Sequence, residues 1–348
     1  MKPSAAHRLD ARWLLPALLL LVLTLAVVAS GLGFIAVSPG QVLRVVAARL
    51  PGLEEMARGL DQLVPHVVWE VRLPRILTAA AVGAGLAMSG AVFQGILQNP
   101  LADPYTLGVS SGAAFGASLC LLLGLDFWGA YSVCLMAFLG ASLTLLAVIW
   151  LSSVDGQASP HNLILSGVIV AAILSAGIGL IKYLADEQVA VIIFWLMGSL
   201  VSKGWLDLGL TLGAGLLGLV VFMYHARDLN LLCLGARAAA SLGVQTKRVR
   251  LTLLITASLV SAVCVAVSGI IGFVGLLIPH LMRALVGPDH RLLLPASACA
   301  GALLLLGADT ITRAALPHEV PIGVLTAIIG GPFFCYVFRR RQMGRVHA

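Results

Sequence analysis

The segment Asn99-Pro100-Leu101-Ala102-Asp103-Pro104 separates two long apolar stretches of the chain and contains no lysine or arginine. Asparagine followed by proline favours a turn, because the proline ring disfavours a helical conformation of the residue before it. The apolar sequence on its two sides is therefore expected to form two helices, the first ending near residue 98 and the second beginning near residue 106. The fold depends on how many such helices the chain contains and how they are oriented.

Composition excludes a water-soluble domain of this length, since 60% of the residues are apolar, 11% are charged and the mean hydropathy is +1.02. The apolar stretch at residues 14–37 is too long for a signal-peptide core and lacks an Ala-x-Ala-like cleavage site, so we expect a retained span. The six cysteines stand singly, without a Cys-x-x-Cys pair, and predict no metal or redox centre. The net charge of +7 comes from loops and the tail, which indicates membrane topology rather than a nucleic-acid partner.

A membrane-spanning helix needs about 20 apolar residues. Nine stretches meet this requirement, at residues 14–37, 73–98, 106–124, 130–152, 162–185, 205–225, 250–269, 291–311 and 321–338. The stretch 272–286 is shorter and contains Pro279, His280 and Arg283, so hydropathy alone leaves it as a re-entrant or broken element.

The distribution of basic residues decides between nine and ten spans. With ten, both termini share a side with fourteen of the 22 basic residues, namely Lys2, Arg8, Arg12, Arg227, Arg237, Lys247, Arg248, Arg250, Arg283, Arg291, Arg339, Arg340, Arg341 and Arg345. The other side then holds eight, namely Arg44, Arg49, Arg58, Arg72, Arg75, Lys182, Lys203 and Arg313. The excess marks the cytoplasmic side. The sequence therefore predicts an all-α polytopic integral membrane protein, a single domain over residues 1–348 with ten transmembrane helices and both termini in the cytoplasm.

Two segments on the predicted exterior are more than simple loops. Residues 38–71 are long and mixed in charge, and their prolines divide them into short helical pieces expected outside the bilayer. Residues 186–204 predict a short amphiphilic helix, Val189 to Leu200, which ends near Gly198.

Catalytic patterns are scarce in the sequence. His318-Glu319 begins like a zinc-protease motif, but Ile322 stands where the second histidine should be. No lysine follows a glycine, which excludes a phosphate-binding P-loop, so any ATP hydrolysis belongs to another polypeptide. An ion-coupled carrier ordinarily has buried acidic residues or histidine along its helices, and their scarcity disfavours that class. An ion-coupled secondary transporter and a polytopic membrane enzyme remain the alternatives.

The predicted cytoplasmic segment 228–250 is rich in small and apolar residues, unlike a loop made only for solubility. Its centre reads Leu234-Gly235-Ala236-Arg237-Ala238-Ala239-Ala240-Ser241-Leu242-Gly243-Val244. Small side chains allow a helix to dock closely against a partner, and Gly243 suits a helix stop. We call residues 228–250 the coupling segment.

An ordered series of motifs resembles the membrane-spanning permease of ABC importers for iron chelates, haem and cobalamin. The motifs are Arg72-Leu73-Pro74-Arg75, Ser89 to Gln94, Asn99 to Pro104, Leu107 to Gly112, Phe194 to Gly198, Leu242-Gly243-Val244, Gly272 to His280 and Pro321 to Thr326. Each string is modest evidence alone, but their order and intervals over most of the chain make a specific signature.

The resemblance implies a type II ABC importer permease fold in the bacterial inner membrane. It implies a homodimer with the pathway on its two-fold axis, two ATPase subunits and a periplasmic substrate-binding protein, without a cofactor. The expected function is translocation of a metal chelate, an iron siderophore or haem, from periplasm to cytoplasm. Cobalamin is the alternative, although Pro160 and His161 are bulkier than the small hydroxyl residues expected in a cobalamin permease.

The resemblance also implies roles for particular residues. ATPase coupling is expected from Arg237, Ala238, Ala239, Ala240, Ser241, Leu242, Gly243 and Val244. The gate is expected at Asn99, Leu101, Pro160 and His161, and binding-protein docking at Arg72, Arg75 and Arg313. Among residues of the second and fifth helices, we expect Met88, Val92, Gly167 and Ala171 to line the pathway at the dimer axis.

The predicted topology is tested by a single cysteine at position 345 in a background without the native cysteines. An impermeant thiol reagent added to intact cells is expected to leave this cysteine unmodified, because the membrane separates the two, and to label it after permeabilisation. A cysteine at position 58 serves as the exterior control. Modification of residue 345 in intact cells would overturn the topology.

Overall fold

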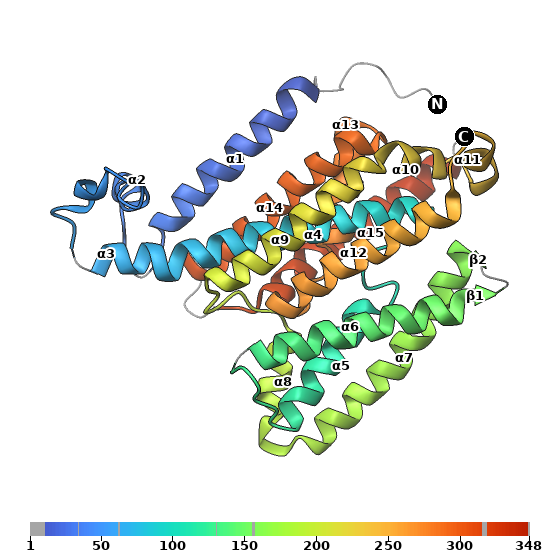
Figure 1. The fold of residues 1–348 in the computed structure, drawn as a ribbon, viewed down its shortest axis with the longest axis horizontal. Helices are drawn as coiled ribbons and strands as arrows, with labels where there is room; N and C mark the ends of the chain where they lie inside the picture. The colour runs from blue at the N-terminus through green and yellow to red at the C-terminus, as the bar shows by residue number, and fades with distance from the viewer. Residues whose placement is uncertain are drawn as a thin grey trace.

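A computed structural model describes residues 11–33, 35–61, 63–129, 131–154, 157–314 and 319–346, and these residues are almost entirely helical (Figure 1). The α-helices are α1 (Ala11–Gly31), α2 (Pro39–Ala47), α3 (Leu63–His66), α4 (Leu73–Ile96), α5 (Val109–Leu122), α6 (Tyr131–Ser152), α7 (Pro160–Leu184), α8 (Val189–Leu196), α9 (Trp205–Tyr224), α10 (Ala226–Leu232), α11 (Ala236–Ser241), α12 (Thr246–Ser268), α13 (Val274–Val286), α14 (His290–Ala314) and α15 (Ile322–Val346). Short 3-10 or π elements are η2 (Glu54–Ala57), η3 (Val67–Arg72) and η4 (Asp186–Gln188). Strands β1 (Ser153–Val154) and β2 (Gln157–Ala158) pair antiparallel.

The apolar stretches predicted from the sequence coincide with these helices, and the ambiguous stretch 272–286 is helix α13. Within the described residues, seven helices are long and apolar enough to cross a membrane, while α5, α13 and the apolar part of α15 are shorter. The fold class is confirmed as an all-α polytopic membrane protein. The count of ten crossings stays a prediction.

The long helices form two neighbouring groups (Figure 1). Helix α4 is the centre of the larger group and contacts α9, α12, α13 and α14, while α1 packs on α14. Helices α5, α6, α7 and α8 form the smaller group, which α12 joins to the rest through contacts with α5 and α6. Helices α2 and α3 lie at one end of the molecule and α10, α11 and the β1–β2 hairpin lie at the other (Figure 1). We call these the α2 end and the α11 end.

Glycine backbones allow the neighbours of α4 to approach it closely. A Cβ atom added to Gly83 would lie 2.2 Å from the carbonyl oxygen of Gly301 in α14, and one added to Gly90 would lie 1.9 Å from that of Gly275 in α13. Such small-residue contacts are typical of helix pairs in membranes, where packing rather than exclusion of water drives association. As a result, 78% of the residues in the membrane-length apolar part of the helix Leu63–Ile96 are buried.

The helix that contains α4 begins earlier than the sequence indicated. We expected a span from residue 73, but helical structure is continuous from Leu63 to Ile96. Pro74 cannot donate a backbone hydrogen bond, and the π-helical turn η3 lies directly before it, with the Leu73 amide bonded to the Val68 carbonyl. A π-turn inside an α-helix commonly accommodates such an interruption.

The two segments predicted on the exterior contain short helical elements. In residues 38–71, α2 and η2 are separate short pieces as predicted, whereas α3 and η3 run on into α4. Helix α8 begins at Val189 as expected but ends at Leu196, and Gly198 has a left-handed backbone with φ +73°. The end comes early because Ser199 and Gly198 pair with other segments: the Ser199 amide donates to the Ser268 carbonyl (2.8 Å), and the Gly198 carbonyl accepts from Ile322 (3.2 Å).

The contact between α4 and α13 predicts that a glycine-to-alanine substitution destabilises the protein at this contact and has little effect at an unpacked helical glycine. Gly90→Ala is expected to lower the free energy of unfolding by about 1–3 kcal/mol, because the added methyl group has no room beside the Gly275 backbone. Gly213→Ala is the matched control, since nothing lies within 4 Å of a Cβ atom at that helical glycine. Thermal unfolding of both variants in detergent measures the difference. Equal midpoints for the two variants would contradict the packing described.

Candidate functional site

The coupling segment folds into α10, α11 and the first turn of α12. Helix α11 stops through two backbone hydrogen bonds, from the Gly243 amide to the Ala240 carbonyl and from the Val244 amide to the Ala239 carbonyl, both 3.0 Å. Gly243 itself has φ +87°. This is a Schellman helix stop, which requires a left-handed residue. The predicted role of Gly243 as a helix stop is confirmed.

Helix α11 presents one side to the exterior of the protein. The exposed residues are Arg237, Ala238, Ala240, Ser241, Leu242 and Gly243, and Val244 is partly buried. Ala239, by contrast, is fully buried in the main hydrophobic core. We expect Ala239 to take part in ATPase coupling, and its burial places it beneath the exposed side of α11.

The turn after α4 contains the first predicted gate residues. The Asn99 side chain accepts a hydrogen bond from the Leu101 amide (3.0 Å), which closes a local turn. Leu101 is 42% exposed. We call residues 99–104 the gate turn.

Asp103 fixes the far side of the gate turn. Its carboxylate accepts hydrogen bonds from the amides of Tyr105 (3.1 Å) and Thr106 (3.0 Å) and from the Thr106 hydroxyl (2.9 Å). Burial raises the pKa of Asp103, while the bonds from Thr106 and Tyr105 act in the opposite direction. The gate turn is therefore fixed at both ends: Asn99 bonds to the backbone within the turn, and Asp103 bonds to the residues that follow it.

The second pair of predicted gate residues begins α7. Ser159 caps this helix by accepting from the Asn162 amide (3.2 Å), Pro160 is the first residue of the helix, and His161 is exposed. No hydrogen bond between this turn and the gate turn occurs among the residues that the structure describes. Packing joins the segments that follow the two turns, because Gly167 of α7 lies against the backbone of residues 106–107.

The residues expected to line a pathway lie inside the subunit. Met88 is 3% exposed and Val92 is fully buried, both in the core around α4. Gly167 is buried, and Ala171 is partly buried beside Gly108. Met88 and Val92 thus face neighbouring helices of their own subunit, because glycines let those helices enclose α4. The exposed residues of α7 include Val168, Ile169 and Ile173.

Two of the three predicted docking arginines cap the end of α1. Arg72 donates to the carbonyl oxygens of Ser30 (2.8 Å), Gly31 (3.3 Å) and Ile35. Arg313 donates to those of Ala29 (2.6 Å) and Leu32 (2.5 Å). The last carbonyls of a helix have no partner within it and carry partial negative charge, so cations stabilise this terminus.

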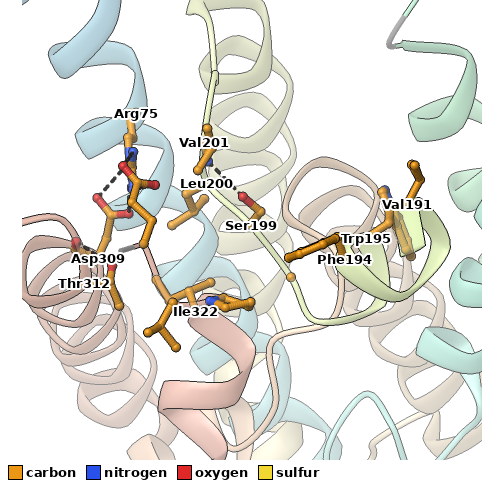
Figure 2. A pocket seen from close by; sticks show the side chains of 14 residues that line it. Arg75, Val191, Phe194, Trp195, Ser199, Leu200, Val201, Asp309, Thr312 and Ile322 are labelled. Carbon is orange, nitrogen blue, oxygen red and sulfur yellow. Dashed lines mark hydrogen bonds and ion pairs between the residues drawn. The ribbon is translucent and has the colours of Figure 1, made fainter. Parts of the chain in front are cut away.

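Arg75 forms an ion pair with two acids at the α2 end. Its guanidinium group contacts the Asp309 carboxylate at 2.8 and 3.0 Å and the Glu319 carboxylate at 3.0 and 3.1 Å. The side chains of Arg75 and Asp309 are only 11% and 2% exposed, whereas that of Glu319 is 43% exposed. Figure 2 shows Arg75 and Asp309 facing each other beside a cavity of about 410 Å³, which Trp195 and Ser199 line from the other side.

The arginines therefore differ from the expectation of a free docking surface. Arg72 is 6% exposed and Arg75 is 9% exposed, and both guanidinium groups bind partners within the subunit. Sequence reasoning assigned no role to Asp309 and Glu319, although an acid within an apolar stretch such as Asp309 signals a buried partner. Nothing in the sequence paired it with Arg75, which lies 234 positions away. His318 lies outside the described residues.

Removing one partner of the Arg75–Asp309 pair is expected to destabilise the protein strongly. Arg75→Gln should lower the free energy of unfolding by about 3–5 kcal/mol, because it leaves a buried carboxylate without its counter-charge. Asp309→Asn in the same chain should recover part of the loss. The control is Arg58→Gln, since the Arg58 side chain is 78% exposed. Thermal unfolding in detergent measures the loss. If Arg75→Gln unfolded at the same temperature as Arg58→Gln, a structural role for the pair would be contradicted.

Comparisons with known proteins agree on one family. A model of the FecCD transport family matches residues 18–340. The molybdate import permease MolB of Haemophilus influenzae is 40% identical and aligns over 94% of this chain and 95% of its own length. The cobalamin import permease BtuC of Halobacterium salinarum is 41% identical (82% and 76%), and the hemin transport permease HmuU of Yersinia pestis is 40% identical (80% and 85%).

A solved structure has the same architecture. It is an inward-facing conformation of an ABC transporter assigned to the metal-chelate type, with a TM-score of 0.82 and 36% sequence identity over 94% of this chain and 98% of that chain. The expected resemblance is confirmed, and the chain belongs to the FecCD transport family.

Proposed function

We propose that this chain is the membrane-spanning permease subunit of an ATP-driven importer that moves a metal chelate, an iron siderophore or haem, from periplasm to cytoplasm. The observation that carries the proposal is the match of most of the chain to the FecCD family, together with its likeness to a metal-chelate type ABC transporter. In this proposal the subunit pairs with a second copy of itself. Two ATPase subunits and a periplasmic binding protein complete the importer.

The α11 end supplies features that suit an ATPase partner. Helix α11 is short, exposed and rich in alanine, and its Schellman stop holds it at a fixed angle to α12. Ala239 packs in the main core and holds α11 against the rest of the protein. A displacement of α11 by a partner is therefore expected to move α12 as well. We propose that this exposed side of α11, with Leu242 at its end, docks against the ATPase.

The α2 end is the proposed docking surface for the binding protein, but with a changed role for the arginines. Arg72 and Arg313 fix the end of α1, and Arg75 fixes the loop that contains Glu319. In this proposal they shape the exterior surface from beneath. Contact with the partner is left to more exposed groups, of which Glu319 is one.

Relatives of similar identity leave the substrate open. Permeases named for hemin, cobalamin and molybdate are 40% to 41% identical to this chain. The likeness to a metal-chelate type transporter favours iron siderophore or haem. Cobalamin is the second candidate, because the corresponding relative is as similar as the one named for hemin.

Uptake into proteoliposomes tests both the energy source and the substrate. The complex of this chain with its co-purified ATPase and binding protein is expected to import a ferric hydroxamate or haemin only when ATP is present on the ATPase side. Cyanocobalamin and molybdate are the comparison probes.

Ala240→Trp should reduce ATPase binding and uptake about tenfold, because a bulky group on the exposed side of α11 separates the docked surfaces.

The matched control is Leu217→Trp, an exposed position on the membrane-spanning helix α9, where uptake should stay at the wild-type level. Transport driven by a proton or sodium gradient without ATP would establish the ion-coupled carrier instead. Import of molybdate or cyanocobalamin alone, still dependent on ATP, would replace the substrate and keep the permease assignment.

A further inference from the structure

Gln98 joins the coupling segment to the gate turn by a single side-chain hydrogen bond. Its amide Nε2 donates to the carbonyl oxygen of Leu232, the last residue of α10, at 2.6 Å. Gln98 directly precedes the gate turn, and Leu232 lies four residues before α11 begins. The two segments are 134 positions apart in the chain. This bond therefore spans the two parts of the α11 end to which coupling and gating are assigned.

The backbone at Gln98 is in the left-handed conformation, with φ +50°. It closes a Schellman stop on α4, in which the Gln98 amide donates to Gly95 (3.3 Å) and the Asn99 amide donates to Gln94 (3.2 Å). Glycine ordinarily occupies this position, as Gly243 does at the end of α11, because a side chain is strained there. At Gln98 the strained position holds a side chain, and that side chain reaches α10.

An open space separates the gate turn from the coupling segment elsewhere. Gln98 and Pro100 line a cavity of about 520 Å³ together with Asn230, Cys233 and Leu234 of the coupling segment. Apolar packing joins α10 to α4 one turn earlier, where Leu229 lies against Gly95. Cys233 adds a weak hydrogen bond from its Sγ to the Gly95 carbonyl (3.9 Å), and the Gln98 bond lies directly beside the gate turn.

Helix α10 is also anchored to the start of α14. The Asn230 side chain accepts from the backbone amide of His290 (3.0 Å) and donates to the Asp289 carboxylate (2.7 Å), both at the start of α14. Helix α10 therefore contacts both the start of α14 and Gln98, the residue directly before the gate turn. A displacement of α11 that tilts α10 about the Asn230 contact moves the Leu232 carbonyl, and Gln98 follows it.

We propose that the Gln98 amide is the positioning link through which the coupling segment moves the gate turn when the ATPase subunits close. The inference rests on the proposed function and names one residue that connects the coupling segment with the gate turn. Wild-type ATP-dependent uptake tests the proposed function, and the link is tested separately by the response of the gate turn to nucleotide.

The test measures thiol labelling of Leu101→Cys in the assembled complex, in a background without accessible native cysteines, with and without ATP and vanadate. Leu101 is 42% exposed and lies within the gate turn, so its labelling rate reports the state of that turn. In the otherwise wild-type complex the labelling rate is expected to change on nucleotide trapping. With Gln98→Gly or Gln98→Glu, ATP hydrolysis should continue while this change shrinks about fivefold, the scale for loss of one coupling contact.

The variants separate the link from a merely structural role. Glycine keeps the left-handed backbone but removes the donor, and glutamate keeps the length but, when ionised, can only accept. Gln98→Lys restores an N–H donor and should restore the response. Ser202→Gly is the matched control, because it removes a side chain at another left-handed position, φ +57°, away from both segments.

A nucleotide response in Gln98→Glu equal to that of the wild type would overturn the proposal. So would a loss of response in Gln98→Lys as large as that in Gln98→Glu, because the donor would then be irrelevant. If Gln98→Gly fails to assemble with the ATPase, the comparison of Gln98→Glu with Gln98→Lys decides the question alone.

Discussion

The close approach of helix backbones around α4 is the constraint on which the rest of the structure depends. At Gly83 and Gly90 the chain has no side chain, and the carbonyls of Gly301 and Gly275 occupy the space that a Cβ atom would need. These contacts bring α13 and α14 onto α4 and enclose it. In a bilayer, where lipid is as apolar as leucine, such packing replaces the hydrophobic effect as the force that holds helices together. Because α4 is enclosed by these helices, the positions of its two ends in the molecule are fixed.

The arginine side chains at the α2 end bind partners inside the protein. On the predicted topology these arginines lie on the exterior side, against the tendency of basic residues to stay in the cytoplasm. Here Arg72 and Arg313 bind the terminal carbonyls of α1, and Arg75 binds Asp309 and Glu319. Each charge has a partner that compensates for burial, because an unpaired charge in this position would be costly. These arginines hold α1, α4 and α14 together where the helices leave the apolar region.

The α11 end is built differently, from helix stops and short helices rather than ion pairs. Gly243 and Gln98 both close Schellman stops in the left-handed conformation, one on α11 and one on α4. Gly243 leaves a smooth exposed surface, whereas Gln98 carries a side chain that reaches the Leu232 carbonyl. Gln98 also lines the cavity between α4 and the coupling segment.

The sequence by itself determined the class of protein, the helix positions, the turn at Asn99, the stop at Gly243 and the family, because hydropathy, proline and glycine act locally along the chain. It predicted a span that begins at residue 73, whereas the helix containing α4 begins at Leu63, since the π-turn before Pro74 leaves no distinct pattern. The tertiary structure decided which faces are buried, and so it enclosed Met88, Val92 and Ala239 and occupied Arg72 and Arg75 with internal partners. Pairs such as Arg75 with Asp309 and Gln98 with Leu232 join residues more than a hundred positions apart. Such pairs arise from helix packing in three dimensions, which no local pattern in the chain encodes.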